Sequence, residues 1–163
     1  MNRPTQIAVI GKGTPDDELG LVAEEVGRRL AEAGAVVICG GLGGVMEGVA
    51  RGASAAGGTV IGIVPSEDPV TANLWCTHVI AAGTGSARNL AVVSSGEAVI
   101  AIGGEWGTLS EIAYARQAGR PVVALASWRV TPATAITNGE GIEPADDPAS
   151  AVELAIALAA AAR

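Results

Sequence analysis

The sequence predicts an α/β fold, a doubly wound parallel sheet of six or seven strands with helices on both faces. Two patterns predict it. Short apolar runs alternate with amphipathic stretches along the chain, which is the sequence form of repeated β-α units. Several of these runs end directly in glycine, as expected where a buried strand turns into a helix. We expect one domain over residues 1–163, because a chain of 163 residues is long enough for one sizeable core.

Six apolar runs predict the strands. Continuous runs, rather than alternating ones, are typical of strands that are buried on both faces of a parallel sheet. The predicted strands cover residues 6–10, 35–39, 59–64, 78–82, 98–102 and 121–125. A seventh short strand within residues 135–143 is a weaker prediction, because Gly139, Gly141 and Pro144 disfavour it.

Amphipathic stretches between these runs predict the helices. The first helix begins at a capping Asp16 or Asp17 and ends before Gly34, which can adopt the positive φ of a helix stop. A second helix covers about residues 45–56, where small side chains allow close approach to the sheet. A last helix covers residues 149–161.

Composition and charge restrict the class of ligand. The net charge of −7 and the pI near 4.6 disfavour binding of a polyanion, so we do not expect nucleic acid as a partner. Cys39 and Cys76 form no metal-binding motif, and we expect no metal site. No apolar run reaches the ~18 residues that span a membrane, and no signal segment opens the chain. These features predict a cytoplasmic protein.

Four of the predicted strands run into glycine-rich loops. The loops are 11–13, 40–44, 83–86 and 103–104. Parallel strands end at one edge of the sheet, so we expect these loops to converge there and to bind an anion through main-chain N–H groups. No loop has the third glycine of the dinucleotide fingerprint, and none ends in Gly-Lys-Ser or Gly-Lys-Thr. A glycine in any one of these loops can equally serve only to permit positive φ.

A helix that follows the fifth strand is the most informative element. We expect it to begin near Thr108 and to carry Glu111 in its first turn, with free N–H groups that suit a phosphate ester. Arg88 stands near the start of the helix after the fourth strand. If the fourth and fifth strands are neighbours, Arg88 and Glu111 lie at the same edge of the sheet. The cation could then bind the anionic part of a ligand, and the carboxylate could stabilise an oxocarbenium-like centre. Taken singly, Arg88 can be a solvated helix residue and Glu111 a capping carboxylate.

These motifs resemble the Lonely Guy family, long mislabelled as lysine decarboxylases. Its members carry Pro-Gly-Gly-x-Gly-Thr-x-x-Glu and an upstream arginine. Here Gly107, Thr108 and Glu111 match that motif, and Arg88 falls at the spacing of the arginine. At the start of the motif a glycine replaces the proline, and Glu105 replaces a glycine.

The resemblance implies a Rossmann-like fold, a homodimer and two alternative functions. In the hydrolase branch, members cleave nucleoside 5′-monophosphates to the free base and ribose 5-phosphate, without a cofactor, and Arg88 and Glu111 would be the catalytic pair. The residues that we expect to bind the substrate are Gly11, Lys12, Gly13, Gly40, Gly41, Met46, Ser86, Gly103, Gly104, Trp106, Gly107 and Thr108.

The second function is non-catalytic binding of molybdenum cofactor. The compact run Gly-Thr-Leu-Ser-Glu-Ile-Ala-Tyr-Ala, followed closely by Gly-Arg-Pro-Val, looks like the branch that includes molybdenum cofactor carrier proteins. Asn89 also stands where the hydrolase branch has a lysine. Both ligands present a phosphate monoester to the same loops. The favoured prediction is the phosphoribohydrolase, and the alternative is the cofactor carrier.

Overall fold

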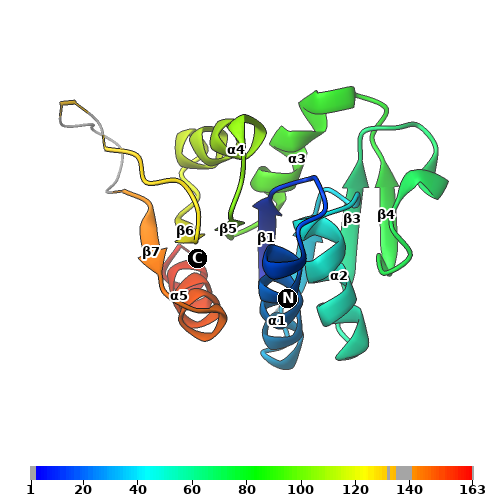
Figure 1. Cartoon of the computed structure of the whole chain (residues 1–163), viewed down its shortest axis with the longest axis horizontal. Helices are drawn as coiled ribbons and strands as arrows, with labels where there is room; N and C mark the ends of the chain where they lie inside the picture. The colour runs from blue at the N-terminus through cyan, green and yellow to red at the C-terminus, as the bar shows by residue number, and fades with distance from the viewer. Residues whose placement is uncertain (1–2, 132, 135–140, 163) are drawn as a thin grey trace.

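A computed structural model, describing residues 3–131, 133–134 and 141–162, shows an α/β domain built on a parallel sheet (Figure 1). Its strand order is β4-β3-β2-β1-β5-β6-β7. The strands are β1 (Gln6–Gly11), β2 (Val36–Cys39), β3 (Val60–Val64), β4 (His78–Ala81), β5 (Ala98–Ile102), β6 (Val122–Leu125) and β7 (Glu143–Ala145). The six main predicted strands are confirmed, and every paired neighbour runs parallel.

The seventh strand lies later in the chain than predicted. It begins at Glu143, whereas the prediction covered residues 135–143, of which 135–140 lie outside the described residues. Pro144 belongs to the strand, although we had counted it against one. The strand tolerates proline because β7 is at the edge of the sheet, where it pairs only with β6.

Helices cover both faces of the sheet, which confirms the doubly wound architecture. The described residues contain five α-helices: α1 (Asp17–Glu32), α2 (Val45–Ala55), α3 (Arg88–Ser95), α4 (Trp106–Gln117) and α5 (Pro148–Ala161). Helices α1, α2 and α5 lie together on one face, and α3 packs beside α4 on the other (Figure 1). None of these helices is both long and apolar enough to cross a membrane. Asp16 caps α1 by accepting a hydrogen bond from the Leu19 N–H at 3.1 Å.

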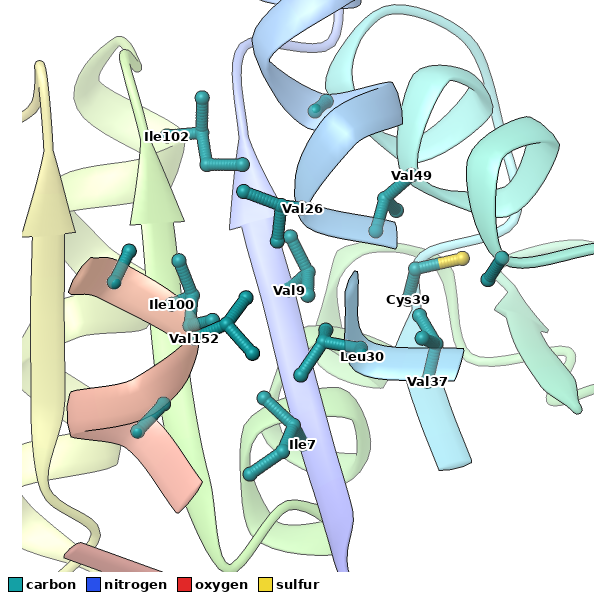
Figure 2. Close-up of a cluster of buried hydrophobic side chains, with 14 of the residues drawn as sticks. Ile7, Val9, Val26, Leu30, Val37, Cys39, Val49, Ile100, Ile102 and Val152 are labelled. Carbon is teal, nitrogen blue, oxygen red and sulfur yellow. The ribbon is translucent and has the colours of Figure 1, made fainter. Parts of the chain in front are cut away.

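The central strand β1 divides the core into two clusters. Ile7 and Val9 point to the face of α1 and α5, and both are fully buried. Figure 2 shows them beside side chains of those two helices. Ala8 and Ile10 point to the opposite face, toward α3 and α4. The alternation follows from the two-residue period of a strand, so one continuous apolar run fills both clusters.

Helices α1 and α2 touch through glycine. A Cβ added to Gly52 would lie 1.9 Å from the carbonyl oxygen of Glu24, and one added to Gly27 would lie 2.1 Å from that of Val49. No side chain fits into either gap. We predicted that the small residues of α2 allow close approach to the sheet; the structure shows that Gly52 also brings the α2 backbone against that of α1.

The two cysteines lie close together at the carboxyl end of β2, whose last residue is Cys39. Cys39 is buried, and its register partner on β3 is Gly62. The Sγ of Cys76 lies 2.5 Å from the position that a Cβ on Gly62 would take. Both cysteines are free. The neighbouring Cys76 thiol, together with burial, raises the pKa of Cys39, and the Cys39 thiol lowers the pKa of the half-buried Cys76.

We expect iodoacetamide to alkylate Cys76 in the folded protein and to reach Cys39 only after unfolding. The thiolate is the nucleophile, and the lower pKa and greater exposure both favour Cys76. Peptide mass mapping after a timed reaction measures the two rates. Equal rates at the two cysteines would contradict the buried position of Cys39.

Candidate functional site

A pocket of about 160 Å³ lies where β1 ends, at the carboxyl edge of the sheet. The strand order reverses between β1 and β5, and open parallel sheets bind ligands at such a reversal. Residues from the ends of β1 and β2 and from α2, α3 and the start of α4 meet there. The lining residues are Val9, Ile10, Gly11, Lys12, Gly13, Gly40, Met46, Arg88, Asn89, Glu105, Gly107, Thr108 and Glu111.

Arg88 and Glu111 face each other in this pocket. The Nη1 of Arg88 lies 4.0 Å from the Oε1 of Glu111, and both residues are buried. Our reason for expecting them together was wrong, because β4 and β5 are not neighbours: β3, β2 and β1 lie between them. The chain after β4 instead returns over the sheet, so that α3 packs on β1 and beside α4.

Burial changes the protonation of this pair. It raises the pKa of Glu111 to about 7, and the charge of Arg88 only partly offsets that effect. Burial also lowers the pKa of Arg88. A separation of 4.0 Å is too long for a hydrogen bond, and the buried Nε of Arg88 has no partner among the described residues. Buried donors without a partner are uncommon, so this guanidinium is suited to an incoming acceptor.

Helix α4 begins at Trp106 rather than near Thr108, so Glu111 lies in its second turn and not in its first. The side chain of the N-cap residue, Glu105, makes no capping hydrogen bond. The N–H groups of the first three helical residues, Trp106 to Thr108, therefore have no acceptor within the helix. They carry the positive end of the helix dipole into the side of the pocket that holds Gly107 and Thr108.

Comparison with known proteins identifies the family. The sequence profile of the SLOG cluster4 family matches residues 4–152. The chain belongs to the SLOG cluster4 family. An uncharacterised protein of Archaeoglobus fulgidus is 46% identical over 120 residues, which cover 74% of this chain and 79% of that protein.

Two solved structures are similar to this SLOG cluster4 protein over nearly their whole length. The molybdenum cofactor binding protein of Rippkaea orientalis is 30% identical, with a TM-score of 0.84 over 96% of this chain and 98% of that one. The molybdenum cofactor carrier protein of Chlamydomonas reinhardtii is 28% identical, with a TM-score of 0.83 over 97% and 99%. The resemblance predicted from the glycine motifs and Arg88 is confirmed.

The pocket of this SLOG cluster4 protein collects most of the predicted site residues. Those that line it are Gly11, Lys12, Gly13, Gly40, Met46, Arg88, Gly107, Thr108 and Glu111. A Cβ at position 40 would lie 2.5 Å from Nη1 of Arg88 and 2.6 Å from Sδ of Met46, so a larger residue there would displace the Arg88 and Met46 side chains in the pocket. Lys12 also forms an ion pair with Asp16 at 3.0 Å.

Five predicted residues lie elsewhere. Gly103 and Gly104 line a second depression, on the other side of the turn that joins β5 to α4. Gly41 packs against β3, since a Cβ there would meet Val64 at 2.8 Å. Trp106 is exposed, and Ser86 lines neither of these two cavities.

The glycine loop after β4, residues 83–86, does not contribute to the pocket. Its Gly83 and Gly85 donate hydrogen bonds to the carbonyls of Ser66 and Pro65, at 3.2 and 3.1 Å. The loop is therefore tied to the segment that follows β3. The predicted convergence of four loops was wrong for this one, because β4 is at the edge of the sheet opposite β7 and is separated from the reversal between β1 and β5 by β3 and β2.

Four lining residues were not predicted: Val9, Ile10, Asn89 and Glu105. Asn89 had a usable signal, because it directly follows Arg88 at the start of α3. Glu105 stands where the family motif has a glycine, and a negative side chain gives no signal for a phosphate site. Val9 and Ile10 belong to the apolar run of β1, and such a run indicates a buried strand but no role in a binding site.

The pH dependence of stability tests the environment of Glu111. Because folding raises its pKa from 4.5 to about 7, the folded state binds the extra proton, and this group's contribution to stability falls as the pH rises from about 4.5 to 7. We expect Glu111→Gln to remove that fall and to be more stable than the wild type above pH 7, by on the order of 2 kcal/mol. Urea unfolding at pH 5 and pH 8 measures the difference. A constant difference between the two proteins at both pH values would contradict the raised pKa.

Proposed function

We propose that this protein binds molybdenum cofactor by its phosphate and carries it without turning it over. The observation that carries the proposal is the similarity to two molybdenum cofactor proteins over nearly the full length of all three chains. The pocket at the end of β1 would hold the phosphate. The cofactor is then cargo, and the chain needs no other group to bind it.

The chemistry of the pocket supports a phosphate. Arg88 offers buried donors, and the start of α4 offers main-chain N–H groups. Glu111, with a pKa of about 7, is largely protonated below neutral pH and can then donate its O–H to a phosphate oxygen. The net charge of −7 gives no long-range attraction, so these local donors must supply the affinity.

The size of the pocket supports binding of the phosphate end alone. Pockets that enclose a whole small molecule usually measure about 300–1,000 Å³. This one measures about 160 Å³, so the rest of the ligand would lie outside it.

A second candidate, hydrolysis of a nucleoside 5′-monophosphate to the base and ribose 5-phosphate, is favoured by one observation. Glu111 is a buried carboxyl with a pKa of about 7, which suits general acid–base catalysis near neutral pH. Arg88 at 4.0 Å would hold the anionic part of that substrate. Neither function requires a metal or a further cofactor. The homodimer that the family resemblance implies stays a prediction, which light scattering tests.

Purification from cells with and without cofactor synthesis tests the main proposal. We expect the protein from producing cells to retain close to one molybdenum and one pterin per chain, measured by elemental analysis and by pterin fluorescence after oxidation. Protein from deficient cells should retain neither. In parallel, a panel of nucleoside monophosphates should release no free base. Base release that Glu111→Ala abolishes and Glu143→Ala, on the edge strand β7, preserves would establish the hydrolase instead.

A further inference from the structure

We propose that the second depression binds the flat heteroaromatic ring of the same phosphate-bearing ligand. This inference rests on the proposed function, in that the phosphate occupies the Arg88 pocket. The depression measures about 550 Å³. It shares Lys12 and Glu105 with the Arg88 pocket, so one ligand can extend from one cavity into the other. The remaining lining residues are Leu19, Gly103, Gly104, Ala126, Ser127, Trp128 and Arg129.

One tryptophan, Trp128, lines this depression, and a second, Trp106, lies against its ring, in a chain with very few aromatic residues. The chain has three Trp, one Tyr and no Phe. The rings of Trp106 and Trp128 lie 5.2 Å apart at an angle of 39°. Trp106 is 77% exposed, which is costly for so large an apolar side chain unless something covers it. A planar ring system would cover it by stacking.

The loop after β6 is held in place against the turn between β5 and α4. The hydroxyl of Ser127 donates a hydrogen bond to the carbonyl of Gly103. The Nε1–H of Trp128 donates to the carbonyl of Glu105 at 3.2 Å. Ala126 adopts a φ of +49°, a left-handed conformation that is unusual for a residue with a side chain and is often found at functional sites. These contacts fix the ring of Trp128 before any ligand arrives.

The carboxylate of Glu105 indicates which edge of the ligand ring would bind in the depression. The carboxylate of Glu105 makes no capping hydrogen bond with α4, and the residue is exposed. A carboxylate accepts two parallel hydrogen bonds from adjacent ring and exocyclic N–H groups, as a 2-amino-4-oxopyrimidine edge presents them. Pterins and guanine share that edge, whereas adenine lacks it. The negative Glu105, which is unfavourable for a phosphate, is thus suited to the ring.

Binding measurements with four probes test the subsite. The probes are inorganic phosphate, the phosphate ester of 6-hydroxymethylpterin, GMP and AMP. The affinity for each probe is measured by calorimetry and by quenching of tryptophan fluorescence. A Trp75→Phe background removes the third tryptophan, which lies in the segment before β4. We expect the pterin ester to bind at least tenfold more tightly than inorganic phosphate and to quench fluorescence.

Variants separate the ring from the phosphate. We expect Glu105→Gln and Trp106→Ala each to weaken the pterin ester about tenfold without changing the affinity for inorganic phosphate. The control, Glu143→Gln on the edge strand β7, should change neither.

The outcomes distinguish this inference from the proposed function. GMP binding more tightly than the pterin ester, with the same dependence on Glu105, would support the subsite and assign it to a guanine nucleotide. AMP binding as tightly as both would overturn recognition of the edge. Equal affinities for the pterin ester and inorganic phosphate would overturn the subsite and leave the phosphate pocket intact. Inorganic phosphate that binds independently of Arg88, or not at all, would count against the proposed function. Calorimetric binding of the pterin ester that Glu105→Gln still weakens would, in that case, continue to support the ring site.

Discussion

Replacing Arg88 by methionine is expected to weaken binding of a phosphate-bearing ligand about 100-fold, because two charge-assisted hydrogen bonds of about 1.5 kcal/mol each are lost. Little stability should be lost with them. The guanidinium is buried with an unpartnered Nε, and methionine fills a similar volume. Without the charge of Arg88, burial alone would raise the pKa of Glu111 further. The Glu111 carboxyl would then be protonated and would not remain as a buried charge. Calorimetric titration and urea unfolding measure the two effects.

The matched control is Arg51→Met on α2. Arg51 pairs with Glu24 at 2.8 Å on the surface, and its loss should change neither binding nor stability by much. If Arg88→Met lost several kcal/mol of stability and still bound the ligand as well as the wild type, Arg88 would be a structural residue.

The second large effect is expected at the contact between α1 and α2. Gly52→Ala should destabilise the protein by about 3 kcal/mol, because its Cβ would overlap the carbonyl oxygen of Glu24 at 1.9 Å and force the two helices apart. Gly20→Ala on α1 is the matched control, since a Cβ there meets nothing within 4 Å. It should stabilise the helix by about 0.5–1 kcal/mol. Urea unfolding of both variants gives the comparison, and similar effects of the two substitutions would mean that the helices are not in backbone contact.

Sequence reasoning located the strands well and their order poorly. A run such as Ala98–Ile102 identifies a buried strand by itself, because the apolar requirement is local. Pairing depends on how helices of different lengths pack on the sheet, and no local pattern records it. The shared position of Arg88 and Glu111 at one edge of the sheet was argued on the condition that β4 and β5 are neighbours, whereas β5 pairs with β1. Arg88 and Glu111 were paired correctly only because a family motif links them.

At the site, the residues that were predicted well are those whose position follows from a strand end. Gly11, Lys12 and Gly13 directly follow or end β1 and line the pocket, as does Gly40 after β2. The turn after β5 was harder, because α4 begins two residues earlier than predicted. Gly103 then faces the second depression.

The contact between Trp106 and Trp128 escaped prediction for a different reason. The two residues belong to separate elements, the start of α4 and the loop after β6, and only the pairing of β5 with β6 brings them together. Nothing in the sequence near either tryptophan indicates the other.

The structure of the protein with bound molybdenum cofactor tests the central claim most directly. We expect a phosphate oxygen within about 3 Å of the Arg88 guanidinium, beside the first N–H groups of α4 and the carboxyl of Glu111. A phosphate bound anywhere else on the molecule, with the Nε of Arg88 still lacking an acceptor, would contradict the claim.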